Sequence, residues 1–131
     1  MKKEQIIKSF IQEITNHKWI VKKSFQWCIN LKDTLYYTHD EGTKSAIAFK
    51  NNFITRYPDA ANYLDITLSI LHEIGHYMTR DEMNYIYPDT YTYDEYFAVH
   101  DEMIATNWAI NYIINNEERV KNFEKLLTMT F

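Results

Sequence analysis

The 131-residue sequence predicts an α+β fold that is mostly helical, with a small antiparallel sheet packed beside the central helix. Long segments carry apolar residues at the spacing of amphipathic helices, whereas one stretch near the N-terminus is rich in aromatic and β-branched residues. Only 2 glycines and 2 prolines are available to make turns, which favours long helices. We expect residues 1–131 to form one domain, because half that length would bury too little surface to offset its ordering entropy.

The helical segments differ in how much of their surface is apolar. Residues 63–78 have apolar side chains almost all round the helix axis, which is typical of a helix in the interior of a domain. The first and last helices have one apolar face and one polar face, whereas residues 94–115 carry a narrow line of small residues. The expected helices are residues 3–16, 63–78, 94–115 and 116–131.

Extended structure is expected between the first two helices. Residues 19–30 predict one or two strands and residues 34–38 predict another, because both stretches are rich in aromatic and β-branched side chains. A turn over residues 40–43 leads to residues 45–50, which alternate as a further strand would. Residues 51–62 then read as a loop.

Pro88 and Asp89 interrupt the helical periodicity, so we expect residues 79–93 to be an ordered surface loop, rich in tyrosine. A tyrosine hydroxyl in such a loop could contact a substrate, but packing is the commoner role and no single tyrosine is assigned one.

Charge and composition exclude several classes of protein. The net charge is −4 and no basic cluster exceeds a pair of lysines, so direct binding to nucleic acid is not expected. There is no run of eighteen apolar residues and no signal peptide, which predicts a cytoplasmic protein without a membrane span. Cys28, the only cysteine, is expected to be a small buried hydrophobe in a reducing compartment.

The strongest chemical signal lies in the central helix, where His72 and His76 are four residues apart. Residues at this spacing share one face of a helix, so both imidazoles can reach a single Zn²⁺ ion. Glu73 lies beside them as a candidate general base, able to take a proton from a zinc-bound water. Gly75 weakens the helix by about 1 kcal/mol relative to alanine, which indicates that another backbone or a substrate approaches there.

A third ligand is expected from the helix over residues 94–115. Three alanines line one side of this helix around Glu102, so it can pack closely against its neighbour. If this face meets the central helix, Glu102 completes a His₂Glu zinc site and leaves the fourth position for water, as catalytic zinc sites do. The alanines are Ala98, Ala105 and Ala109.

His100 and Asp101 are rival ligands to Glu102. His100 would give a three-histidine site, but it lies about 200° round the helix from Glu102, so both cannot bind one ion without unwinding. The choice of metal also stays open, because the same donors accept Mn²⁺, Co²⁺ or Ni²⁺. His17 and His39 lack partners at metal-site spacing and are assigned no chemistry.

Two motifs together resemble the ImmA/IrrE family of zinc metallopeptidases. The first is the His72-Glu73-Ile74-Gly75-His76 stretch, and the second follows after 25 residues as Glu102-x-x-Ala105-x-x-Trp108-Ala109, with tryptophan where the family has phenylalanine. The resemblance covers roughly residues 45–115. It implies a fold similar to thermolysin-like zincins, zinc ligands at His72, His76 and Glu102, and a general base at Glu73.

The resemblance also implies a function. Members of this family include enzymes that cut helix-turn-helix repressors to switch on mobile-element or stress-response genes. We therefore expect a hydrolase, a zinc-dependent endopeptidase that acts on a protein such as a repressor. Substrate identity rests on this analogy alone.

Two other functions remain open at this stage. One is a catalytically inactive zincin scaffold that binds a protein partner as an antirepressor or inhibitor, without cutting it. The other is a purely structural zinc domain, in which removal of the metal would unfold the protein. Replacement of Glu73 by glutamine separates the first from a protease, and chelation separates the second.

Overall fold

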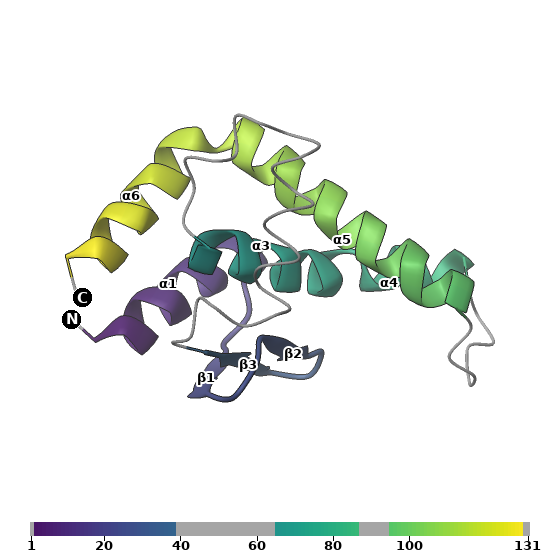
Figure 1. The fold of residues 1–131 in the computed structure, drawn as a ribbon, viewed down its shortest axis with the longest axis horizontal. Helices are drawn as coiled ribbons and strands as arrows, with labels where there is room; N and C mark the ends of the chain where they lie inside the picture. Colours follow the sequence, from purple (N-terminus) through teal and green to yellow (C-terminus); the bar gives the residue numbers. More distant parts are fainter. Residues whose placement is uncertain (1, 39–64, 87–94, 130–131) are drawn as a thin grey trace.

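The computed structural model describes residues 2–38, 65–86 and 95–129, and it places α3 (Asp65–Met78) at the centre of the molecule (Figure 1). Helix α5 (Glu95–Asn115) packs along one side of α3, and a three-stranded sheet lies on the other side. The fold is therefore α+β and mostly helical, and the sheet lies beside the helix that carries the histidine motif, as the sequence predicts.

The other helices within the described residues are α1 (Lys3–Thr15), α4 (Arg80–Ile86) and α6 (Glu117–Thr128). Helices α1, α3, α5 and α6 agree with the predicted ranges to within a few residues at each end that the structure describes. Helix α6 pairs with α1, so the first and last described helices lie side by side (Figure 1).

The prediction of a loop over residues 79–93 is wrong for α4. Asp81 and Glu82 lie in the first turn of this helix, where negative charge favours the helix dipole, and Met83 is buried against the rest of the protein. The periodicity alone places the end of the helical region too early, because the tertiary packing of Met83 is not visible in it. Residues 87–94 lie outside the described part of the chain.

The sheet has the order β1-β3-β2, with β1 (Ile20–Lys23) and β2 (Cys28–Asn30) on either side of β3 (Thr34–Tyr37). Strands β2 and β3 are antiparallel, but β1 and β3 are parallel. The prediction of an antiparallel sheet is therefore correct for one pair and wrong for the other. Two successive reversals of the chain return β3 to the direction of β1, and β3 then inserts between the earlier strands.

Several predicted features lie outside the described residues. They are the strand at 45–50, the loop at 51–62 and His39. The described helices include none that is long and apolar enough to cross a membrane.

One continuous core joins the described elements. Trp19, Leu35 and Tyr37 bring the sheet and its flanking segment against α3, where Ile70 and Ile74 are fully buried. Because α3 is covered on both sides, polar groups on this helix can be buried too, and their positions are set by the packing around them.

Candidate metal centre

Helix α3 presents His72 and His76 on the face that meets α5. His72 is buried, with 8% of its surface exposed, and His76 is half-buried. Their rings lie edge to face, with centroids 4.7 Å apart. Two imidazoles held in the interior require polar partners, and the surroundings of both rings supply them.

Helix α5 reaches these rings because the two helices approach closely. A Cβ atom added to Gly75 would overlap the backbone carbonyl of Ala105, so only glycine fits at this position. Ala105 and Ala109 are fully buried along the same contact. The glycine therefore admits another backbone, which is one of the two explanations that the sequence left open.

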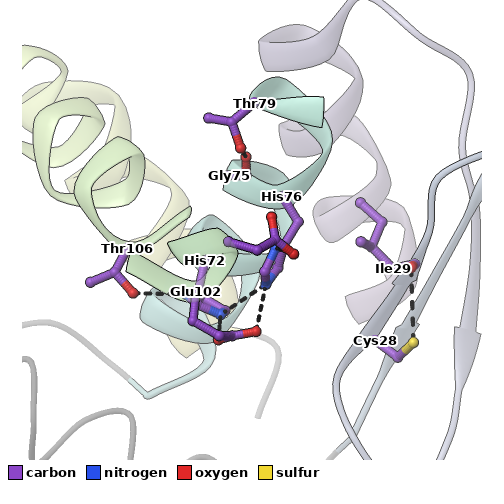
Figure 2. Close-up of polar contacts among 9 residues, drawn as sticks. Cys28, Ile29, His72, Gly75, His76, Thr79, Glu102 and Thr106 are labelled. Carbon is purple, nitrogen blue, oxygen red and sulfur yellow. Dashed lines mark hydrogen bonds and ion pairs between the residues drawn. The ribbon is translucent and has the colours of Figure 1, made fainter. Parts of the chain in front are cut away.

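The side chains of His72, His76 and Glu102 point toward a common centre between α3 and α5 (Figure 2). Nε2 of His72 lies 2.8 Å from one carboxylate oxygen of Glu102, and Nε2 of His76 lies 3.1 Å from the other. The two Nε2 atoms are 3.2 Å apart. The structure thus brings together the three side chains that the sequence named as ligands.

The other ring nitrogen of each histidine has its own partner on α5. Nδ1 of His76 lies 3.2 Å from the carboxylate of Asp101, and Nδ1 of His72 lies 3.2 Å from the hydroxyl of Thr106. A carboxylate and a hydroxyl oxygen can both accept a hydrogen bond from an Nδ1–H group, which leaves the Nε2 lone pairs directed at the centre. Hydrogen bonds of this kind fix the tautomer and the orientation of metal-ligating histidines.

Sequence reasoning missed these two partners. It treated Asp101 only as a rival ligand, whereas the structure places it behind His76, and it did not single out Thr106. The available signal was helical spacing, since Thr106 is four residues after Glu102 and therefore shares its face. The other rival, His100, is not among the described residues that line the cleft beside the cluster.

The ionisable groups of the cluster shift one another's pKa values strongly. Hydrogen bonds from His72 and His76 hold the pKa of Glu102 well below its usual range. Burial favours a lower pKa for His76, but its hydrogen bond to Glu102 and the nearby carboxylates outweigh burial and raise the pKa to about 9. Without another cation, the cluster therefore binds a proton between these groups at neutral pH.

Glu73 lies next to the cluster but has a different environment. One potential metal-ligand atom from each of His72, Glu73 and His76 lies within 4.8 Å of the other two. Burial raises the pKa of Glu73, although both histidines oppose the rise. The backbone N–H of Ile29, on the edge strand β2, donates a hydrogen bond to the Glu73 carboxylate, which ties this side chain to the sheet.

A cleft of about 300 Å³ opens beside the cluster, between β2, α3, α4 and α5. Its charged lining includes Glu73, Asp101 and Glu102. The side chain of Glu102 is 61% exposed, so the cluster is open to solvent on this side. The apolar residues of the lining are Trp27, Ile29, Leu31 and Met83.

Cys28 also lines this cleft, and the prediction that it is buried is wrong. It lies on β2, in which Cys28 and Asn30 are exposed and Ile29 between them is half-buried, so its side chain belongs to the exposed face of the strand. Partial burial, together with the charge of Glu73, raises the pKa of the thiol, so Cys28 is not activated as a nucleophile.

The geometry of the cluster fits a tetrahedral cation. Zinc-to-nitrogen bonds of about 2.0–2.1 Å place two ligand atoms about 3.3–3.4 Å apart at the tetrahedral angle. The two Nε2 atoms are 3.2 Å apart, and they lie 2.8 and 3.1 Å from the two different oxygens of Glu102. These separations are slightly smaller, so an outward shift of a few tenths of an ångström would accommodate an ion. Lone pairs from three side chains converge here, which is unfavourable unless a proton or a metal ion lies among them.

Comparisons with protein-family models, with curated proteins and with solved structures give no match to this chain.

Proposed function

We propose that this protein is a zinc-dependent endopeptidase in which His72, His76 and Glu102 hold the ion and Glu73 is the general base. The observation that carries the proposal is the convergence of two Nε2 atoms and a carboxylate on one point. The hydrogen-bond acceptors behind both rings support it, because they orient the histidines for a metal.

A bound zinc ion supplies Lewis acidity, which polarises a scissile carbonyl and makes water a better nucleophile at neutral pH. Glu73 takes the proton from the attacking water and passes it to the departing amine. Burial raises the pKa of Glu73 toward neutral pH, which favours this role because a general base is most effective when its pKa lies near the working pH. The N–H of Ile29 holds the carboxylate in place during this exchange.

The open side of the cluster favours catalysis over a purely structural metal site. Structural zinc has four protein ligands, whereas catalytic zinc keeps one position for water or substrate. Here three side chains converge, and the exposed Glu102 borders a cleft that can admit a peptide. The fourth position would face this cleft.

The resemblance of the two motifs to the ImmA/IrrE family supports a wider proposal. On that basis the substrate is a protein, with a helix-turn-helix repressor as the first candidate, and the compartment is the cytoplasm. The net charge of −4 agrees with action on a protein rather than direct contact with nucleic acid. The resemblance alone carries these details.

Metal analysis tests the ligand set. The purified protein should contain one zinc ion per chain, and Glu102→Ala should weaken zinc affinity by well over about tenfold, because it removes a charged ligand. His100→Ala is the matched control and should bind zinc normally, because His100 lies on the same helix but is not among the described residues that line the cleft beside the cluster. Normal affinity in Glu102→Ala with loss of zinc in His100→Ala would show that the third ligand is His100.

A second experiment tests catalysis. Glu73→Gln keeps the size of the side chain and both histidines, so it should bind zinc but cut a degenerate peptide library about 10²–10⁴-fold more slowly. Chelation should abolish cleavage while circular dichroism shows a folded protein; unfolding on chelation would indicate a structural zinc instead. If Glu73→Gln retains the full biological effect of the protein, the peptidase proposal fails and a partner-binding scaffold replaces it.

A further inference from the structure

Helix α4 presents a polar pair to the cleft that the proposed hydrolysis does not use. Arg80 and Asn84 are four residues apart, so they lie on one face of the helix, and both line the cleft. Met83, from the same helix, also lines the cleft and is buried. The cleft is therefore lined both by His76 and Glu102 of the cluster and by a cation and an amide from α4.

The guanidinium of Arg80 is held firmly in this position. Its Nη1 atom donates a 2.6 Å hydrogen bond to the backbone carbonyl of Tyr77, and its central carbon lies 3.9 Å from the centre of the Tyr77 ring. That ring is itself fixed, because it packs edge to face against buried Trp19 with centroids 4.8 Å apart. A guanidinium has five N–H groups, so most of them remain for another partner.

No carboxylate of the described residues forms an ion pair with Arg80. The acidic side chains in the same cleft are engaged elsewhere: Asp101 and Glu102 with the histidines, and Glu73 with the backbone of Ile29. A half-buried arginine that has no anionic partner within residues 2–38, 65–86 and 95–129 and is fixed in a cleft is suited to bind an anion brought by a ligand.

We propose that Arg80 and Asn84 form a subsite for a carboxylate of the peptide bound in the cleft. Arg80 would bind the carboxylate through paired N–H groups, and the amide of Asn84 would donate a further hydrogen bond. The carboxylate is either an acidic side chain or the C-terminal carboxylate, which present the same chemistry. This inference rests on the proposed peptidase function, because it names the kind of peptide that the cleft selects.

The net charge of the protein does not by itself favour binding of acidic peptides. A chain with a net charge of −4 repels acidic peptides at long range, so a preference for them must come from a local site. The apolar residues Ile29 and Met83 in the same cleft would contact the uncharged part of the peptide. The subsite thus predicts an acidic group beside an apolar one.

The first experiment measures binding of defined peptide pools to the zinc-loaded Glu73→Gln protein. Pools of random peptides carry glutamate or glutamine at a fixed position, each with a free or an amidated C-terminus. Pools with the relevant carboxylate should be retained at least about tenfold better than their neutral counterparts, because hydrogen bonds to charged groups are strong. Dependence on glutamate identifies a side chain, and dependence on the free C-terminus identifies the terminal carboxylate.

Variants of α4 then assign the effect to the subsite. In the Glu73→Gln protein, a further Arg80→Gln substitution should abolish the preference for peptides with the carboxylate. Arg80→Lys should keep part of this preference because the charge remains, and Asn84→Ala should reduce it a few-fold. Arg119→Gln removes an arginine on α6, outside the cleft, and should leave the preference unchanged. Equal retention of all pools, or a preference that survives Arg80→Gln, overturns the proposal.

Cleavage of the same pools by the unsubstituted protein separates this proposal from the peptidase function. If no pool is cut but the carboxylate preference in binding depends on Arg80, the peptidase proposal fails and the subsite stands. If the pools are cut at equal rates and bound equally, the peptidase stands and the subsite fails.

Discussion

The α3–α5 pair and the α1–α6 pair are both buried, but they are built from side chains of opposite size. Where α3 meets α5, Gly75 and Ala105 bring the two backbones together. Where α1 meets α6, the rings of Phe10 and Phe123 stack with centroids 3.8 Å apart and almost parallel planes. One contact is made by backbones and the other by large apolar side chains.

The difference follows from what each contact must hold. Short polar side chains can meet across a helix pair only when the backbones are close, and the separations around Glu102 depend on that approach. The aromatic stack between α1 and α6 carries no such group and buries a large apolar area instead. We therefore expect substitutions in the first contact to affect the metal site and those in the second to affect stability alone.

The largest effect on stability is expected from Phe123→Ala in the α1–α6 contact. Loss of a buried phenylalanine costs about 3–5 kcal/mol of unfolding free energy. Zinc affinity, measured under conditions where the variant is folded, should not change, because the stack is remote from the cluster. Chemical denaturation and zinc titration check the two parts, and a large loss of affinity in the folded variant would contradict the separation of the two contacts.

A smaller change in stability but a greater change in function is expected from Gly75→Ala. The added methyl overlaps the carbonyl of Ala105, which costs about 1–3 kcal/mol, and the gain in helix propensity of about 1 kcal/mol offsets only part of this. Zinc affinity should fall, because Glu102 moves away from the histidines as the helices separate.

Ala109→Gly is the control for this substitution. It weakens α5 by about 1 kcal/mol through helix propensity but does not force the helices apart, so zinc affinity should persist. A Gly75→Ala protein that is more stable than the unsubstituted protein and binds zinc equally well would refute the role given to close backbone approach.

Substitution of the hydrogen-bond acceptors behind the histidine rings should change zinc affinity but not stability. Asp101→Asn and Thr106→Val each remove or weaken the acceptor at one Nδ1 atom, and such changes typically cost about 10–100-fold in metal affinity. Glu118→Gln removes an exposed carboxylate on α6 and serves as the control for loss of charge. Competition against a zinc-binding dye measures the effect; if neither variant differs from the control, the two side chains do not orient the rings.

The smallest effect concerns a polar contact outside the metal site. The hydroxyl of Tyr37 on β3 donates a 2.5 Å hydrogen bond to Glu4 on α1, and Tyr37→Phe should lower stability by about 0.5–1.5 kcal/mol without changing zinc affinity. Burial and this bond raise the pKa of Tyr37 above its ordinary value of 10.0.

The raised pKa gives this contact a pH dependence. A group with a raised pKa stabilises the fold fully below its unfolded pKa and loses that contribution as the pH rises, so the difference between the protein and Tyr37→Phe should shrink above about pH 10. Urea denaturation at several pH values measures it, with Tyr36→Phe on the same strand as the control. A stability difference that stays constant over this pH range would contradict the raised pKa of Tyr37 as the source of the pH dependence.

Much of the fold was predictable because it depends on local periodicity. The apolar pattern of residues 63–78 places a buried helix around His72 and His76, and the alanines around Glu102 indicate which face of the next helix approaches it. The parallel pairing of β1 with β3 was not predictable in this way, since strand order depends on contacts between distant residues.

Periodicity and spacing along the chain were enough to predict the main helices, the position of His72, Glu73 and His76 on one of them, and the carboxylate of Glu102 on another. Which atoms meet became visible only in the folded protein. The tertiary structure placed Asp101 and Thr106 behind the rings, tied Glu73 to the edge of the sheet and turned α4 toward the cleft. The physical reason is that spacing along a helix fixes which face a residue occupies, whereas contacts between elements depend on how closely their backbones can pack.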